Sequence, residues 1–140
     1  MKKDIWGPKF WFFLHTIAHN YPPRPNAITK RKYYELMHSM PIFLPDVAIG
    51  NIFGDMLINY PLSPYLDSRD SFVRWMWFVH NKVNERIGKR PLSFEEGLDA
   101  YRAMYEPDPV HVSRVLRLSE ECVYGGAMAA VLVLICVFRE

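Results

Sequence analysis

Prolines divide this chain into segments in which apolar residues recur at the spacing of an α-helix. In the first segment, Phe10, Leu14 and Ile17 lie four and three residues apart, so their side chains share one helix face. A proline cannot continue the hydrogen-bond ladder of a helix, and we expect Pro41 and Pro45 to end the second segment. Alternation with a period of two, which is typical of a half-buried strand, does not persist. The spacing predicts five helices, over about residues 8–20, 28–40, 47–58, 69–87 and 94–105.

The predicted fold class is all-α. The chain has 140 residues, of which 50% are hydrophobic and 23% charged, so it has the length and apolar content of one globular domain. Four main helices with short connections form a bundle, in which ligand sites lie between facing helices. We expect a four-helix bundle plus a short fifth helix within a domain of residues 1–106, followed by an apolar C-terminal helix.

Residues 122–138 form a run of seventeen without a charge. As a helix this run would span about 26 Å, close to the thickness of the hydrocarbon core of a bilayer. A buried C-terminal helix is the alternative. The lack of a polar stripe favours a membrane anchor, preceded by a hinge and juxtamembrane segment over residues 107–121. Arg114 and Arg117 in that segment suggest that the globular part is cytosolic.

Net charge and cysteine content exclude several classes of function. The net charge is only +2 and the Lys and Arg residues are scattered, whereas a nucleic-acid site needs a clustered basic face. Two cysteines, Cys122 and Cys136, are too few for a disulfide scaffold. On one straight helix their Cα atoms would be about 21 Å apart, too far for a disulfide. Sequence motifs of phosphate-binding loops, serine hydrolases and zinc proteases are absent.

His15 and His19 are four residues apart, a spacing that metal ligands on a helix use. No glutamate stands between them to act as a base, and no clear third ligand follows. Packed or hydrogen-bonded histidines are the better interpretation, and we predict no metal site. Glu95 and Glu96 could be read as an acid–base pair, but helix capping explains them with fewer assumptions.

Two stretches carry a more specific signal. Residues 7–25 contain the pattern GxxxWxxLHTIAxxYPxxP, and residues 75–89 contain WxxxxHNxVNxxIGK. Both patterns, with their internal spacings, resemble the Erv/ALR family of FAD-linked sulfhydryl oxidases, and the resemblance covers roughly residues 6–105. The detail of residues 64–69, PYLDSR, is most similar to family members encoded by large DNA viruses.

The resemblance implies that the bundle holds FAD at one end and forms a homodimer. It also implies which residues contact the cofactor. Trp and Tyr rings can stack on flat rings, whereas His, Asn and Lys can donate hydrogen bonds to ring carbonyls and to the pyrophosphate. His80 and Asn84 lie four residues apart and share a helix face. By their positions in the two stretches, the expected cofactor-binding residues are Gly7, Trp11, His15, Tyr21, Trp75, His80, Asn81, Val83, Asn84 and Lys89.

The chain departs from the family at the residues that carry its redox chemistry. Family members have a Pro-Cys-x-x-Cys pair at the start of the third helix, beside the flavin. If Pro41 is the family proline, Ile42 and Pro45 occupy the cysteine positions. If Pro45 is the family proline, Asp46 and Ile49 occupy them. Neither placement supplies a thiol, so we predict no catalytic residue.

A further family cysteine, two residues after the tryptophan of the fourth helix, is Trp77 here. The resemblance predicts an oxidase that moves electrons from a protein dithiol to oxygen through FAD, with the proximal thiols missing. In one interpretation, a partner's dithiol or a cysteine of another chain, with Cys122 as the candidate within this sequence, reduces the flavin. In the other, the protein is a non-catalytic FAD-binding scaffold on a virion or host membrane and partners an active paralogue.

Overall fold

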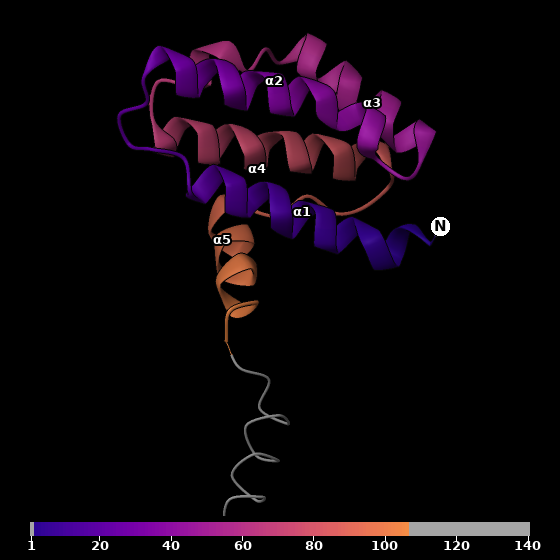
Figure 1. The fold of residues 1–140 in the computed structure, drawn as a ribbon. Coiled ribbons are helices and arrows are strands. Elements are labelled where there is room, and N and C mark those ends of the chain that lie inside the picture. The colour runs from indigo at the N-terminus through magenta and orange to yellow at the C-terminus, as the bar shows by residue number, and fades with distance from the viewer. Residues whose placement is uncertain (1, 107–140) are drawn as a thin grey trace, which may run out of the picture. The chain divides into compact units, whose positions relative to one another are not determined.

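The structure is a computed structural model that describes residues 2–106 (Figure 1). This part of the chain is helical and contains no strand. The predicted all-α class is therefore confirmed, as are the four main helices and the short fifth helix. The segments predicted over residues 107–121 and 122–138 lie outside the described residues. In chain order the elements are α1 (Lys3–His19), α2 (Ala27–Phe43), α3 (Val47–Asn59), the 3-10 helix η1 (Ser63–Tyr65), α4 (Arg69–Arg86) and α5 (Phe94–Ala103).

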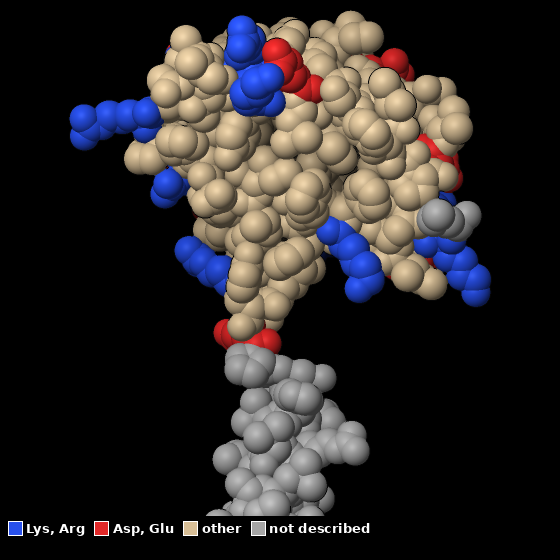
Figure 2. All heavy atoms as spheres, in the orientation of Figure 1, with Lys and Arg blue, Asp and Glu red and all other residues tan. Residues whose placement is uncertain are grey.

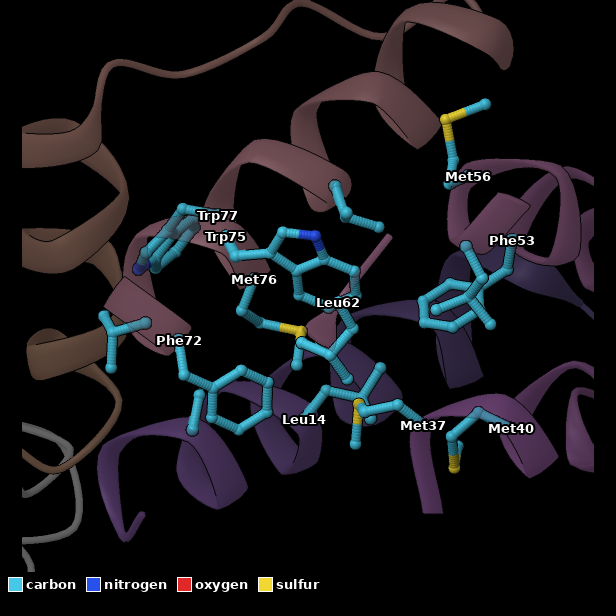
Figure 3. Close-up of a cluster of buried hydrophobic side chains, with 14 of the residues drawn as sticks. Leu14, Met37, Met40, Phe53, Met56, Leu62, Phe72, Trp75, Met76 and Trp77 are labelled. Carbon is cyan, nitrogen blue, oxygen red and sulfur yellow. The ribbon is translucent and has the colours of Figure 1, made fainter. Parts of the chain in front are cut away.

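Helix α4 is central to the bundle. It packs against α1 and against α3, and α2 packs against α3 (Figure 1). Buried side chains of these four helices meet in one hydrophobic core (Figure 3). Phe72 and Trp75 of α4 lie there with Leu14 of α1, Met37 of α2 and Phe53 of α3. The helices α1 and α4, which carry both motif stretches, are thereby held face to face.

Two prolines lie inside helices rather than at their ends. Helix α1 begins before Pro8, and α2 continues through Pro41 to Phe43. The prediction that Pro41 ends the second helix is therefore wrong. The φ angle of proline suits a helix, and near the end of α2 its missing N–H removes only one hydrogen bond. Packing against α3 stabilises this last turn, because the Pro41 carbonyl lies directly against Gly50.

Local capping groups set the boundaries of α3 and α5. The Asp46 side chain accepts hydrogen bonds from the backbone N–H groups of Ala48 and Ile49, at 2.9 and 3.1 Å. Ser93 and Glu96 form a reciprocal capping box, in which each side chain accepts a hydrogen bond from the other residue's backbone N–H. The predicted capping role of Glu96 is confirmed, and both caps are encoded within four neighbouring residues.

The surface of the described residues is mostly uncharged on the face shown in Figure 2. The Lys and Arg side chains on this face lie in several separate groups, mainly near its edge. Of the helices within residues 2–106, none combines the length and the apolar character that a membrane crossing requires.

Candidate functional site

Four aromatic rings meet where α1 packs against α4. Trp11 and His15 are one turn apart on α1, and Trp77 and His80 are one turn apart on α4. The rings of Trp11 and His80 are stacked, with centroids 3.8 Å apart and planes inclined by 10°. The rings of His15 and Trp77 are stacked at 3.6 Å and 23°. We call these four residues the ring cluster, and three of them are predicted cofactor-binding residues.

The two histidines of the ring cluster share a hydrogen bond and are uncharged. His15 Nε2 lies 2.9 Å from His80 Nδ1. Burial lowers the pKa of His15 to about 2, and repulsion from His80 and His19 adds to this shift. Burial also lowers the pKa of His80 to about 3, with a smaller contribution from the positive charge of Lys89. Because a charged imidazole would be poorly solvated here, both rings are neutral near pH 7.

Two buried nitrogen atoms of the ring cluster have no hydrogen-bond partner within the described residues. They are His15 Nδ1 and Trp77 Nε1, on side chains of residues that are 2% and 5% exposed. A buried polar atom without a partner costs roughly 1–3 kcal/mol, and such atoms are uncommon in folded proteins. Their occurrence on two rings that stack on each other indicates a site where a ligand completes the hydrogen bonding.

Helix α5 accommodates the ring of Trp77 at a glycine. A β-carbon at Gly97 would lie 2.6–2.9 Å from three ring carbons of Trp77, which is closer than a real contact allows. One turn later, Tyr101 stacks on His19 with ring centroids 4.7 Å apart. The Tyr101 hydroxyl also donates a hydrogen bond to Thr16 Oγ1 at 3.1 Å. Helix α5 therefore packs beside the ring cluster and against the C-terminal half of α1.

The two histidines with metal-ligand spacing have separate surroundings. His15 belongs to the ring cluster, whereas His19 stacks on α5. Within residues 2–106, no three His, Cys, Asp or Glu side chains are grouped closely enough to hold a metal ion.

Tyr21 and Trp75, both predicted to contact the cofactor, lie in the hydrophobic core. The Tyr21 hydroxyl donates a hydrogen bond to the Leu66 carbonyl at 2.8 Å. Trp75 Nε1 donates to the Tyr60 carbonyl at 3.1 Å. The polar atoms of both side chains are thus already bonded to the backbone. The Tyr21 ring contacts Tyr33 and Phe72, and the Trp75 ring contacts Phe72, rather than the ring cluster.

The end of α4 carries the remaining predicted residues of the second stretch. Asn81 Nδ2 donates to the Leu92 carbonyl at 2.7 Å, and its Oδ1 accepts from the Leu92 N–H at 3.0 Å. Asn81 therefore fixes the loop between α4 and α5. In that loop, the Lys89 N–H donates to the carbonyl of Asn84, whose side chain is mostly buried. The Lys89 ammonium lies 4.0 Å from Asp4 Oδ1 on α1.

Val83 and Gly7, the last two predicted cofactor-binding residues, lie in different surroundings. Val83 is 1% exposed and belongs to the core. Gly7 faces open space, since a β-carbon placed on it would have no neighbouring heavy atom within 4 Å. Of the ten predicted residues, the structure brings Trp11, His15 and His80 into direct contact, and the other seven take no part in this ring contact.

The expected position of a thiol pair is the junction of α2 and α3. Ile42 is 83% exposed in the last turn of α2, and Pro45 lies between the two helices. Asp46 is the N-cap of α3, and Ile49 is in its first turn. The start of the third helix thus coincides with the second of the two placements, at Asp46 and Ile49.

Trp77 is the site residue that the sequence motifs did not identify. In the sequence it stands out only as a replacement for a family cysteine. Its neighbours His15 and Gly97 are distant along the chain, so no local pattern could show the contact. The one sequence signal for such a contact is Gly97, because a glycine inside a predicted helix often has a packing reason.

Comparisons with known proteins agree with this architecture. The profile of the Erv1 / Alr family matches residues 8–102. A probable FAD-linked sulfhydryl oxidase of Acanthamoeba polyphaga mimivirus is 33% identical over 108 residues, covering 76% of this chain and 76% of that protein. An FAD-linked sulfhydryl oxidase of African swine fever virus is 31% identical over 101 residues, covering 72% of this chain and 80% of that protein. The crystal structure of the yeast Erv1 core matches with a TM-score of 0.62 and 25% identity, over 66% of this chain and 77% of that chain.

Proposed function

The chain belongs to the Erv1 / Alr family, and on this premise we propose that it binds FAD and acts as a sulfhydryl oxidase. The observation that carries the proposal is the ring cluster between α1 and α4. There, stacked flat rings and two buried nitrogen atoms without partners among residues 2–106 occur where the family resemblance expects the cofactor. The similar viral proteins are named FAD-linked sulfhydryl oxidases, which supports the same cofactor and reaction class.

The side chains around the ring cluster fit the groups that FAD presents, which are two planar ring systems joined through a pyrophosphate. Trp11 and His80 offer aromatic ring surfaces. His15 Nδ1 and Trp77 Nε1 offer unused hydrogen-bonding atoms. Lys89 is close enough to His80 to lower its pKa, and its charge suits a pyrophosphate. Bound FAD would accept two electrons from thiols and pass them to oxygen.

The proposed reaction converts a protein dithiol and molecular oxygen into a disulfide and hydrogen peroxide. Two electrons and two protons leave the two thiols as the S–S bond forms, and oxygen takes up both. Residues 2–106 contain no cysteine. If residues 122–136 form one straight helix, Cys122 and Cys136 would be too far apart to form a disulfide with each other. We therefore propose that a partner protein supplies the dithiol.

A second candidate function is favoured by the junction of α2 and α3. Asp46 accepts two backbone hydrogen bonds there, and Ile49 is apolar, so the start of α3 is complete without thiols. A protein of this kind would bind FAD and act as the non-catalytic partner of an active oxidase. The two candidates share the cofactor and differ in whether thiols reduce it.

The visible absorption spectrum of the purified protein distinguishes the two candidates. Both predict a flavin band. If the protein is an oxidase, dithiothreitol added without oxygen should bleach the band faster than it bleaches free FAD, and readmitted oxygen should restore it. A band that persists supports the non-catalytic candidate. Folded protein that shows no flavin band after saturation with FAD and removal of the excess would overturn both.

Membrane anchoring through residues 122–138 is a separate proposal, supported by the uncharged run and by Arg114 and Arg117 before it. The full chain should then remain with membranes after alkaline extraction, and protease added from the cytosolic side should cleave the globular domain. Release into the supernatant would contradict it. We also propose the homodimer that the family implies, which sedimentation equilibrium of the FAD-loaded protein in detergent would check.

A further inference from the structure

We propose that Trp77 contacts the adenine end of the cofactor and that its indole N–H donates a hydrogen bond to the adenine ring. This inference rests on the proposed binding of FAD. The motif stretches do not assign such a role to this position, where the family resemblance expects a cysteine. The contact would therefore be a property of this chain rather than one shared across the family.

Two tryptophans of α4 show what distinguishes Trp77. Both are buried, since Trp75 is 2% exposed and Trp77 is 5% exposed. Trp75 Nε1 donates to the Tyr60 carbonyl, whereas Trp77 Nε1 has no acceptor among residues 2–106. In Figure 3 the side chains of Trp75 and Trp77 extend from α4 in different directions. Burying an indole N–H without a hydrogen-bond acceptor costs free energy, and a ligand that supplies an acceptor recovers this cost.

The ring of Trp77 is fixed by its neighbours. It stacks on His15, and Gly97 of α5 leaves the space that any larger residue would fill. A ring held in this way presents its N–H in one direction. His15 Nδ1, which also lacks a partner among residues 2–106, is on the ring stacked against it. Adenine suits such a pair, because its edges carry ring-nitrogen acceptors beside an amine donor.

The residues next to the ring cluster indicate which of the two ring systems of FAD lies beside Trp77. Trp11 lies 6.1 Å from Phe53 of α3, between ring centroids. The family resemblance expects the reacting thiols at the start of α3, so the redox-active ring belongs on this side. Trp77 instead adjoins α5 at Gly97. We therefore place the adenine on the side of the ring cluster that faces α5.

The test compares three probes on the full chain. Trp77→Phe keeps a flat apolar ring and removes the N–H group. One neutral hydrogen bond corresponds to about a 2- to 10-fold change in affinity. The dissociation constants for FAD and ADP should both rise by that factor, and that for riboflavin, which lacks adenine, should not change. Trp6→Phe, the same substitution beside Phe10 and outside the ring cluster, is the matched control and should change none of the three.

The outcomes separate this inference from the proposed function. An unchanged affinity for ADP, or an equal loss for riboflavin, would overturn the role of Trp77 and leave FAD binding intact. Failure of the unaltered protein to bind FAD would overturn the proposed function instead. If Trp77→Phe does not fold, the indole N–H resonance of Trp77 in the unaltered protein decides. Saturating ADP should move it downfield and slow its exchange with water, and no shift would contradict the inference.

Discussion

The α1–α4 interface and the α2–α3 junction belong to the same bundle but differ in whether their buried polar groups have hydrogen-bond partners. At the interface, stacked rings bury two nitrogen atoms that have no hydrogen-bond partner in the described part of the chain. At the junction, Asp46 satisfies the first N–H groups of α3, and Gly50 lets the Pro41 carbonyl approach closely. The first region leaves two hydrogen-bonding atoms unused, whereas the second is satisfied by the protein alone. Under the proposed function, the cofactor site and the thiol site that the family resemblance expects beside it are separate features of one fold.

The largest effect is expected when a thiol pair is placed at the junction. In the double variant Asp46→Cys with Ile49→Cys, the two cysteines stand at the N-cap and in the first turn of α3. Their Cα atoms would be about 5 Å apart, within the range of a disulfide, and the helix N-terminus lowers the pKa of a thiol there. Oxygen consumption with dithiothreitol should rise on the order of tenfold or more above that of the unaltered protein.

The other possible placement supplies the control. Ile42→Cys with Pro45→Cys puts one cysteine in the last turn of α2 and the other between the helices. This variant should not show the gain, because neither thiol lies at the start of α3. An equal gain in both double variants, or no gain in either when both are folded and loaded with FAD, would refute the difference between the two placements.

The next largest effect concerns stability in acid and arises at the interface. The pKa of His15 is lowered from 6.5 to about 2 and that of His80 to about 3. Below pH 6.5 the unfolded chain therefore binds more protons than the folded one, and the free energy of unfolding falls as the pH drops toward 3. Each histidine contributes about 1.4 kcal/mol per pH unit in this range. Denaturant titrations at pH 7 and pH 5 should differ by about 3–4 kcal/mol.

Two substitutions test whether this acid sensitivity belongs to the ring cluster. His15→Gln should remove about half of the difference between pH 7 and pH 5. His38→Gln, at an exposed position of α2, should leave the difference in place. Equal stability of the unaltered protein at the two pH values would mean that the histidines are not a buried neutral pair.

A smaller loss of stability is expected at the contact between α2 and α3. A β-carbon at Gly50 would lie 2.6 Å from the Pro41 carbonyl oxygen, so Gly50→Ala forces the two helices apart. We expect the free energy of unfolding to fall by about 1–3 kcal/mol. Gly54→Ala, one turn later, meets only the Pro41 ring at 3.9 Å and is the control. It should be neutral or stabilising, because alanine favours the helix. Loss of stability in the control alone would contradict the packing described here.

The smallest effect concerns the cap of α3. Asp46→Ala removes the acceptor of two backbone hydrogen bonds and should lower the free energy of unfolding by about 1 kcal/mol. Asp46→Asn retains an oxygen acceptor and should be close to neutral. Denaturant titration measures both. A loss in Asp46→Asn as large as that in Asp46→Ala would show that charge, rather than capping, matters at this position.

The helices could be predicted from the sequence because their signals are local. Apolar spacing and the caps at Asp46 and Ser93 are contained within one or two turns. All five helices are found where the spacing predicts them, although α1 begins at Lys3 rather than near residue 8. The position of Pro41 inside α2 could not be predicted in this way, since it depends on a contact with Gly50 on the next helix. A sequence shows that proline disfavours a helix interior, but it does not show the tertiary contact that stabilises one.

The site was predictable only where a residue's partner is also a motif residue. Trp11, His15 and His80 come together as the two stretches suggest. Tyr21 and Asn81 bond instead to backbone groups of Leu66 and Leu92, whose positions follow from the tertiary fold. Their predicted contact with the cofactor remains a prediction.

The hydrogen bond between His15 and His80 couples the protonation of the two nitrogen atoms that lie outside it, His15 Nδ1 and His80 Nε2. Both rings are neutral, so in each ring only one of the two nitrogen atoms carries a proton. If His15 Nε2 donates to His80 Nδ1, then His15 Nδ1 is an acceptor and His80 Nε2 carries a proton. If the bond runs the other way, both outer atoms exchange roles. The outer nitrogens are therefore always opposite in character, and a ligand that chooses the tautomer at one end also sets it at the other, with no movement of the backbone.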